Sequence, residues 1–171
     1  MATLETERLV LRIPVMADFD AFAAMWADES VNKHITGKTW SRKESWGKFC
    51  GNVGAWALKG YGQWSVVHKE TDSYLGQVGF FDADRGIGDD FDKDREAGWV
   101  FMPKAHGQGY ATEAMQAALN WFDAQEFGDR VVCMMDADYA ATRRVAQKCG
   151  FSEMRRTSDE HGDVLLMERL V

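Results

Sequence analysis

Cysteine and proline are scarce in this sequence, and long runs of apolar residues are missing. Its three cysteines, Cys50, Cys133 and Cys149, form neither an even disulfide set nor a metal-ligand spacing. This usage is typical of a reducing cytoplasm, where we expect the protein, with Cys133 and Cys149 as small core residues. No apolar run approaches the ~18 residues that a membrane span needs, and the N-terminus lacks the apolar segment of a secretion signal.

Basic residues are also fewer than acidic ones. The 20 Lys and Arg residues stand against 27 Asp and Glu, which gives a formal net charge of -7. Nucleic-acid-binding proteins usually carry a basic face, so we expect no nucleic-acid partner, and the missing spans predict no membrane partner. The length of 171 residues, without internal repeats or low-complexity linkers, predicts a single domain over residues 1–171.

Hydrophobic periodicity predicts helices and strands in mixed order. Alternation over residues 9–13 predicts a first strand, and two helices follow, one capped by Asp18 and one opened by the capping box Ser41 and Glu44. Further strands are expected at 63–68, 74–82, 97–101, 130–136, 153–157 and 164–170, and further helices at 111–122 and 141–148. This order predicts an α+β fold: one mixed, mostly antiparallel sheet of about seven strands with helices on both faces.

The most informative stretch is His-Gly-Gln-Gly-Tyr-Ala-Thr-Glu-Ala at residues 106–114. It lies between an apolar strand and a helical pattern, and its glycines at 107 and 109 leave backbone N–H groups uncovered. The start of a helix favours an anion, so the stretch predicts a phosphate or pyrophosphate site. A plain turn, with glycines for tight packing, is the alternative. The Walker tripeptide is missing, and Thr112 occupies the place of the third glycine in the dinucleotide fingerprint.

Three segments together resemble one family. The run 96–103 followed by Gly-Gln-Gly-Tyr-Ala-Thr-Glu-Ala resembles the acyl-CoA signature of the GNAT N-acetyltransferases, especially the branch with the ribosomal-protein N-terminal alanine acetyltransferases. Residues 6–12 resemble that branch's first strand, and residues 141–151 resemble its next helix with the Gly-Phe that follows. The resemblance implies the acyl-CoA N-acyltransferase fold. It also implies transfer of an acetyl group from acetyl-CoA, without a metal, to a primary amine such as a protein N-terminus or a small amine.

The resemblance also implies the cofactor site. Backbone N–H groups of the glycine segment would hold the pyrophosphate, the strand edge at 99–102 would pair with pantetheine amides, and the N–H of Phe101 or its neighbour would stabilise the oxyanion. We therefore expect acetyl-CoA to be bound by Phe101, Met102, His106, Gly107, Gln108, Gly109, Tyr110, Ala111 and Thr112. His106 stands where the family usually has Arg or Gln, and this branch often Trp. It is either a cation near the pyrophosphate or a tolerated substitution.

Catalysis requires that an alkylammonium lose a proton before it attacks the acetyl group directly. Glu96 opens the key strand where this branch often has glutamate, so we expect it to act as general base through a water molecule. The alternative is a solvated carboxylate at a strand end. The family's thiolate-protonating tyrosine is matched by Ala146. Tyr139 stands at the place of the family's helix-start asparagine, and it is expected either to bring a hydroxyl near the CoA sulfur or to be a packing residue. Thr142 is expected either to hydrogen-bond the thiolate or to cap the helix.

Several questions stay open at this stage. The aspartate-rich segment 82–95 is either a solvated loop or an acidic rim that favours a basic acceptor. Trp26, Trp40 and Trp46 either wall the acceptor pocket, which the first two helices border in the family, or fill the core. A non-catalytic acyl-CoA-binding regulatory domain is the alternative function, and a nucleotide-phosphate binder is a third. Many relatives dimerise, so the resemblance allows a homodimer.

Overall fold

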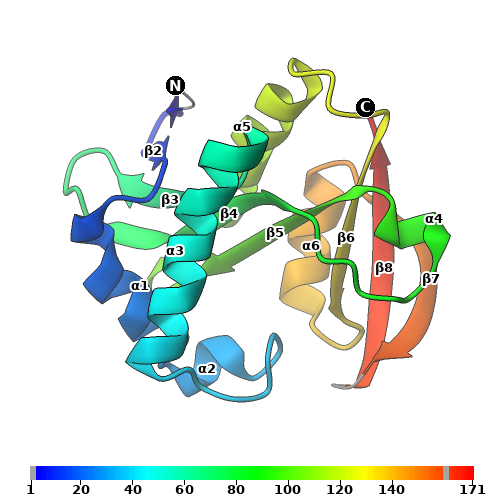
Figure 1. Cartoon of the computed structure of the whole chain (residues 1–171), viewed down its shortest axis with the longest axis horizontal. Coiled ribbons are helices and arrows are strands. Elements are labelled where there is room, and N and C mark those ends of the chain that lie inside the picture. The colour runs from blue at the N-terminus through cyan, green and yellow to red at the C-terminus, as the bar shows by residue number, and fades with distance from the viewer. Residues whose placement is uncertain (1–2, 160–161) are drawn as a thin grey trace.

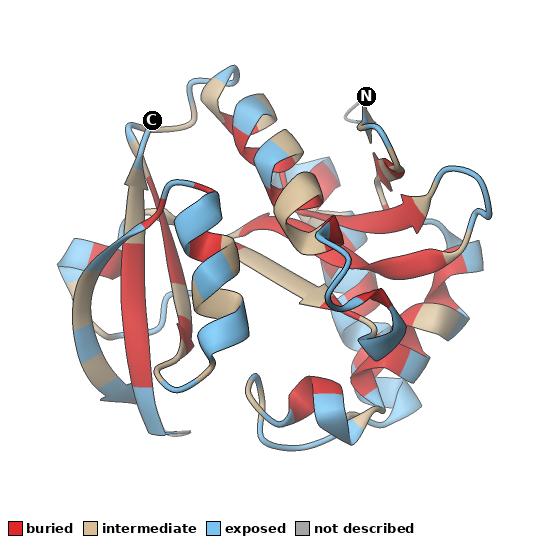
Figure 2. Cartoon of the chain, turned by 180° about the vertical axis from the view of Figure 1, so that it is seen from behind, coloured by how far each residue is buried: buried red, intermediate tan, exposed pale blue. Residues whose placement is uncertain are grey.

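The computed structural model describes residues 3–159 and 162–171. They form one open sheet of eight strands in the spatial order β1-β2-β3-β4-β5-β6-β8-β7, with helices on both faces (Figures 1 and 2). The strands are β1 (Leu4–Glu5), β2 (Leu9–Arg12), β3 (Gln63–His68), β4 (Tyr74–Phe81), β5 (Arg95–Phe101), β6 (Arg130–Asp136), β7 (Ser152–Asp159) and β8 (Gly162–Leu170). The predicted α+β architecture is confirmed, with one strand more than about seven.

The helices lie between these strands in the chain. They are α1 (Phe19–Trp26), α2 (Glu29–Asn32), α3 (Arg42–Lys59), α4 (Asp89–Asp92), α5 (Tyr110–Asp123) and α6 (Ala140–Lys148), with short 3-10 turns at Met16–Asp18 and Pro103–Ala105. The helices α1 and α3 cover one face of the sheet, and α5 and α6 cover the other (Figures 1 and 2). Among the residues that the structure describes, none of these helices is long and apolar enough to cross a membrane.

The middle of the sheet contains its one parallel strand pair, β5 with β6. Their pairing is short, because only Arg95 and Glu96 on β5 face Val131 and Val132 on β6. Beyond Glu96, β5 continues along β4 while β6 continues along β8, so the two strands diverge (Figure 1). The divergence leaves the facing edges of both strands unpaired in the centre of the sheet.

The main core lies between the sheet and α5. The apolar stripe predicted for this helix is buried at Ala114, Met115, Ala118, Leu119 and Phe122. The ring of Phe122 contacts that of Phe80 on β4, with centroids 4.5 Å apart, and both residues are fully buried. Cys133 and Cys149 are buried free thiols, as predicted. This packing anchors the start of α5 beside the point where β5 and β6 diverge.

Two local predictions need correction. The capping box of Ser41 and Glu44 is present at the start of α3, but the Asp18 side chain makes no cap bond to α1. Asp18 instead accepts hydrogen bonds from the Val15 N–H and from the Arg12 guanidinium, because a cation from β2 lies within reach. The core alternative for Trp46 is also wrong, since this residue of α3 is 43% exposed and packs its ring on Phe19.

Glu113 joins the first turn of α5 to the N-terminal strands. Its carboxylate accepts hydrogen bonds from Thr6 Oγ1 at 2.6 Å, from the Arg8 N–H at 3.0 Å and from Arg8 Nε at 2.7 Å. Burial raises the pKa of Glu113, but the hydrogen bonds from Thr6 and Arg8 outweigh burial and leave the pKa below its usual value. The carboxylate therefore stabilises the fold in its ionised form.

We expect Glu113→Gln to lower the free energy of unfolding by about 1.5–3 kcal/mol near neutral pH, the range for hydrogen bonds to a charged group. Because the folded-state pKa lies below the unfolded one, this contribution is complete above the unfolded pKa and disappears as pH falls through the folded pKa. Urea unfolding of both proteins at about pH 7 and about pH 3 measures the change. A difference between the proteins that is equally large at both pH values would contradict this account.

Candidate active site

A cleft of about 1010 Å³ lies where β5 and β6 diverge. Its lining comes mainly from β5, the end of β6, the glycine segment with the start of α5, one side of α6 and the segment after α2. One or two residues each of α1, α2, α3, β3, β4, β8 and the connection before α4 complete it. Most predicted site residues line it: Glu96, Phe101, His106, Gly107, Gly109, Tyr110, Ala111, Thr112, Tyr139 and Thr142. The exceptions are Met102, which packs with the core of α1, and Gln108, whose side chain donates to the Lys104 carbonyl.

The glycine segment presents a row of backbone donors to this cleft. Gly107 and Gly109 have left-handed backbones, with φ of 74° and 81°, and Gly109 is the N-cap of α5. In the part of the chain that the structure describes, the backbone N–H groups of residues 107–112 have no hydrogen-bond acceptor. Donors at the start of a helix, together with the helix dipole, form an anion site. The segment can therefore accept an anion, and its role as the pyrophosphate site stays a prediction.

Contacts from outside the cleft fix this segment. Arg8 donates to the Gln108 carbonyl at 3.0 Å and lies over the Tyr110 ring, 4.5 Å from its centroid. Tyr110 is buried, with 8% exposure. His106 contacts the Phe101 carbonyl through Nε2 at 2.9 Å, which requires the proton on Nε2. Its ring therefore fixes the turn between β5 and the glycines.

The cleft-facing edge of β5 carries a further donor. A Cβ added to Gly76 on β4 would lie 2.3 Å from the Val100 oxygen, so this carbonyl points toward β4. Because backbone groups alternate along a strand, the N–H of the next residue, Phe101, points toward the cleft. This is the donor that the sequence analysis expected beside the reacting acyl group.

Two cations that were not selected from the sequence also line the cleft. Arg144 and Lys148, on successive turns of α6, line the cleft, are exposed and have no carboxylate partner among the described residues. Arg143, by contrast, turns away and pairs with Glu153 on β7. In a helix with three basic residues, only the spacing relative to the apolar positions could have indicated which of them face the cleft.

Glu96 lies in the cleft where β5 and β6 separate, and it is 3% exposed. Both of its oxygens accept hydrogen bonds from Arg85, from Nε and from a terminal nitrogen, each at 2.7 Å. Burial raises the pKa of Glu96, and the Arg85 cation opposes this rise without cancelling it. The alternative of a solvated strand-end carboxylate is therefore wrong, because neighbouring strands cover this position.

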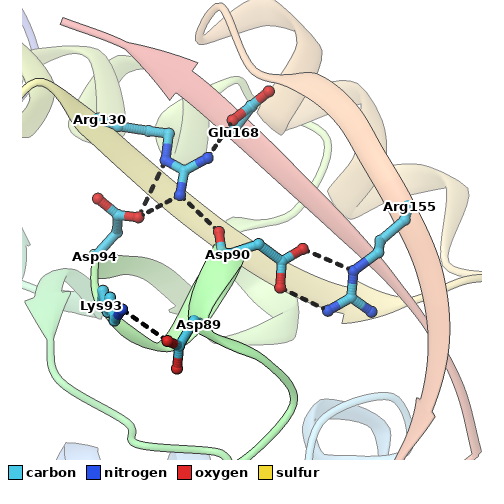
Figure 3. A network of polar contacts seen from close by, with 7 residues as sticks. All are labelled: Asp89, Asp90, Lys93, Asp94, Arg130, Arg155 and Glu168. Atoms are coloured by element: carbon cyan, nitrogen blue, oxygen red, sulfur yellow. Dashed lines mark hydrogen bonds and ion pairs between the residues drawn. The ribbon is translucent and has the colours of Figure 1, made fainter.

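The aspartates before β5 belong to a structural network rather than to a free loop or an acidic rim. Asp90 forms a two-point contact with Arg155 on β7, and Asp94 pairs with Arg130 on β6, which also contacts Glu168 on β8 (Figure 3). Within the described residues, no group of carboxylates and other ligands could hold a metal ion. Arg85 is the one residue of 82–95 that lines the cleft. The segment therefore brings a cation to the cleft, not a carboxylate.

A histidine and a carboxylate that the sequence did not single out join the two sides of the cleft. His34, from the segment after α2, contacts Asp136 Oδ2 at the end of β6 through Nδ1 at 2.6 Å. Its ring stacks on Tyr139, with centroids 4.3 Å apart. Thr142 is the third residue of α6, whose N-cap is Tyr139, so the cap alternative for Thr142 is wrong. No local pattern could have paired residues that lie 102 positions apart.

The tryptophans of the first helices divide between the cleft and the outer surface. Trp26 and Trp40 stack with their ring centroids 4.1 Å apart, and both line the cleft. Trp46 lies outside the lining, on the exposed side of α3. Trp26 is also part of the buried core, so the core alternative describes it as well. The role of Trp26 and Trp40 as walls of an acceptor pocket stays a prediction.

Comparison with known proteins places this geometry in a family. The model of the acetyltransferase (GNAT) domain matches residues 8–152. A structure from Bordetella pertussis, described as a GNAT-family acetyltransferase, is 30% identical, covers 99% of both chains and has a TM-score of 0.87. The uncharacterised N-acetyltransferase YnaD of Bacillus subtilis is 27% identical over 90% of this chain and 82% of its own length. The curated Bacillus relatives are matched over 52% to 82% of their lengths.

Ribosomal-protein acetyltransferases are also among the similar structures. The ribosomal L7/L12 α-N-protein acetyltransferase RimL, solved with coenzyme A, is 16% identical with a TM-score of 0.83 over 99% of this chain and 98% of its own. At that identity the likeness shows the fold alone. The domain match and the Bordetella pertussis structure carry the assignment: the chain belongs to the GNAT acetyltransferase family and is an N-acetyltransferase.

Proposed function

We propose that this protein transfers the acetyl group of acetyl-CoA to a primary amine by direct attack, within one domain and in the cytoplasm. The observation that carries the proposal is the row of backbone N–H groups at residues 107–112, which have no acceptor in the described part of the chain and belong to a segment that lines the cleft at the start of α5, Gln108 excepted. A pyrophosphate is the ligand chemistry that such a row recognises.

The residues present fit acetyl-CoA, which supplies the activated acetyl group when bound. The N–H groups of the glycine segment, including that of Gln108, would hold the pyrophosphate. Arg144 and Lys148 on α6 add two positive charges to the cleft, which favours a polyanion in a protein of negative net charge. The free edge of β5 from Trp99 to Phe101 would pair with the pantetheine amides, as neighbouring strands pair. Met102, which follows β5, is not available for this pairing because its N–H donates to the Leu75 carbonyl.

The amine is activated by Glu96 in this proposal. A carboxylate whose pKa is raised by burial is a stronger base than an exposed one, and Arg85 keeps it ionised and oriented. The amine nitrogen bonds to the acetyl carbon as the carbon–sulfur bond breaks, and the amine's proton passes to Glu96 through a water molecule. The Phe101 N–H donates a hydrogen bond to the acyl oxygen, where negative charge develops.

The leaving thiolate needs a hydrogen-bond donor other than the tyrosine that Ala146 replaces. Thr142 lines the cleft near the start of α6 and has a hydroxyl without a described partner, so we assign it this role. Tyr139 brings a second hydroxyl to the same wall, where its ring is held against His34. Both hydroxyls are weaker acids than a thiol, and they would therefore stabilise the thiolate by hydrogen bonds until solvent protonates it.

Turnover with a panel of amines tests the proposal. Protein N-terminal peptides, polyamines, aminoglycosides and amino acids are each incubated with acetyl-CoA, and the release of free CoA thiol is followed. We expect amine-dependent release for at least one class, with a rate that rises with pH as Glu96 and the amine lose their protons. Release that never exceeds the amine-free rate, although acetyl-CoA binds, would contradict the proposed transfer.

A further inference from the structure

The part of the cleft around Glu96 carries more positive than negative charge. Lys48 from α3 and Arg85 both line it, whereas Glu96 is the carboxylate beside them. Arg85 and Glu96 neutralise each other through their two-point contact. The other carboxylates of the lining belong to the far wall, where Asp136 is bound to His34. One positive charge, that of Lys48, is therefore left beside the proposed base.

Lys48 has no ion-pair partner in the described part of the chain. Its ammonium lies over the Phe81 ring, 5.7 Å from the centroid. Lys48 is an exposed residue at the cleft. Partial desolvation there lowers the pKa of Lys48, the Arg85 charge lowers it further, and Glu96 opposes both. An anionic group bound beside the Lys48 ammonium would stabilise its charged form.

Neutral groups complete this part of the cleft. Gln63 and Gln77, on β3 and β4, are buried and line it. The buried Oε1 of Gln63 lacks a hydrogen-bond partner among the described residues, so it can accept from an amine N–H. The Phe81 ring, beneath the Lys48 ammonium, adds an apolar surface to the lining. The lining therefore offers acceptors for an amine and a cation for an anion on one side of the cleft.

We infer that the acceptor is a small amine that also carries a carboxylate, such as an amino acid, with the carboxylate bound by Lys48 and the amine placed against Glu96 and Gln63. The inference rests on the proposed acetyl transfer and names its substrate class. It replaces the expectation of a basic acceptor from the aspartate-rich segment, because Asp82, Asp90 and Asp94 are bound to cations of the fold and lie outside the lining.

Matched amines that differ only in the carboxylate test this inference. The free amino acids are compared with their C-terminal amides, and with spermidine as a polycation, in turnover with acetyl-CoA. We expect at least one free acid to exceed its own amide in kcat/KM by about tenfold or more, the effect of one charge pair in a partly desolvated site. The amine of an amino acid amide is less basic than that of the free acid, so more of it is in the reactive neutral form. This difference alone would favour the amide, and it therefore cannot produce the expected preference for the acid.

Variants of α3 assign the preference to one residue. Lys48→Gln is expected to remove the preference for acids, Lys48→Arg to keep most of it, and Lys48→Glu to favour amides. Lys43→Gln, which removes a cation of the same helix outside the cleft lining, is the matched control and should behave as wild type. Equal kcat/KM for acids and amides in the wild type, or a preference unchanged in Lys48→Gln, would overturn the inference while leaving acetyl transfer intact.

Binding without turnover separates the two proposals. Calorimetric titration of the same acids and amides into the protein saturated with CoA, which has no acetyl group to transfer, measures acceptor binding alone. Acids should bind more tightly than their amides, and Lys48→Gln should lose the difference. Acid binding that depends on Lys48, with no acetylation of any amine, would refute the proposed transfer and not the anion site. No difference between acids and amides would refute the anion site.

Discussion

Replacing Glu96 by glutamine is expected to lower kcat/KM for acetyl transfer by about 10²- to 10⁴-fold, the usual contribution of a positioned general base. The amide keeps the shape of the side chain and can still accept one hydrogen bond from Arg85, but it cannot take a proton from the amine. Because Glu96 lies apart from the glycine segment, the dissociation constant for acetyl-CoA should stay within about twofold. Steady-state kinetics and calorimetry on the same preparation measure both quantities.

The pH profile distinguishes a base from a merely structural carboxylate. In the wild type, kcat/KM should fall as pH decreases through the raised pKa of Glu96, and this limb should be missing in Glu96→Gln. Glu153→Gln, which removes a carboxylate paired with Arg143 outside the cleft, is the control and should keep both rate and profile. If kcat/KM of Glu96→Gln stays within about threefold of the wild-type value, Glu96 is not the general base. His34 and Asp136 would then be the next pair to test.

Gly109→Val is expected to weaken acetyl-CoA binding by about tenfold or more. Gly109 is the N-cap of α5 with φ 81° and ψ 0°, a conformation that a β-branched residue avoids. Relief of that strain would rotate the peptide units that aim the N–H groups of residues 107–112 into the cleft. The loss of one or two of these charge-assisted hydrogen bonds accounts for the expected change in affinity.

The chain provides a closely matched control for backbone strain. Gly60 ends α3 with φ 76° and ψ 4°, almost the conformation of Gly109, and a Cβ there would meet nothing within 4 Å. Gly60→Val should therefore carry a similar stability cost while leaving the dissociation constant for acetyl-CoA unchanged. Equal affinities in Gly109→Val and Gly60→Val would show that the glycine segment does not hold the cofactor.

The elements with strong local patterns were predictable from the sequence. The strand predicted at 130–136 is found at these residues, because a continuous apolar run has few alternatives to a buried strand. The amphipathic face of α5 and its glycine start were likewise predicted, since both the helical period and the left-handed glycines are local properties. The strand β1, with two residues, is too short to carry a pattern.

The charges of the cleft could not be predicted in this way, because they depend on contacts between distant segments. Arg85 appeared as one basic residue among aspartates, and only the fold turns it toward Glu96 and turns Asp90 toward Arg155. Burial of Glu96 follows from the short pairing of β5 with β6, which has no signature in either strand. The glycine segment could be identified from the sequence because its anion-binding groups are backbone N–H groups of one continuous segment. The acceptor part of the cleft could not, because its side chains come from distant segments that only the fold brings together.

The central claim, that the cleft is an acyl-CoA site, is tested most directly by thermal unfolding with acetyl-CoA, CoA, ATP or NAD in excess. A ligand at about 100 times its dissociation constant adds about 2.7 kcal/mol of stability. We predict that acetyl-CoA and CoA raise the midpoint and that ATP and NAD do not, because the free edge of β5 recognises the pantetheine that those nucleotides lack. Unchanged midpoints with acetyl-CoA and CoA, or equal shifts with all four compounds, would contradict the assignment.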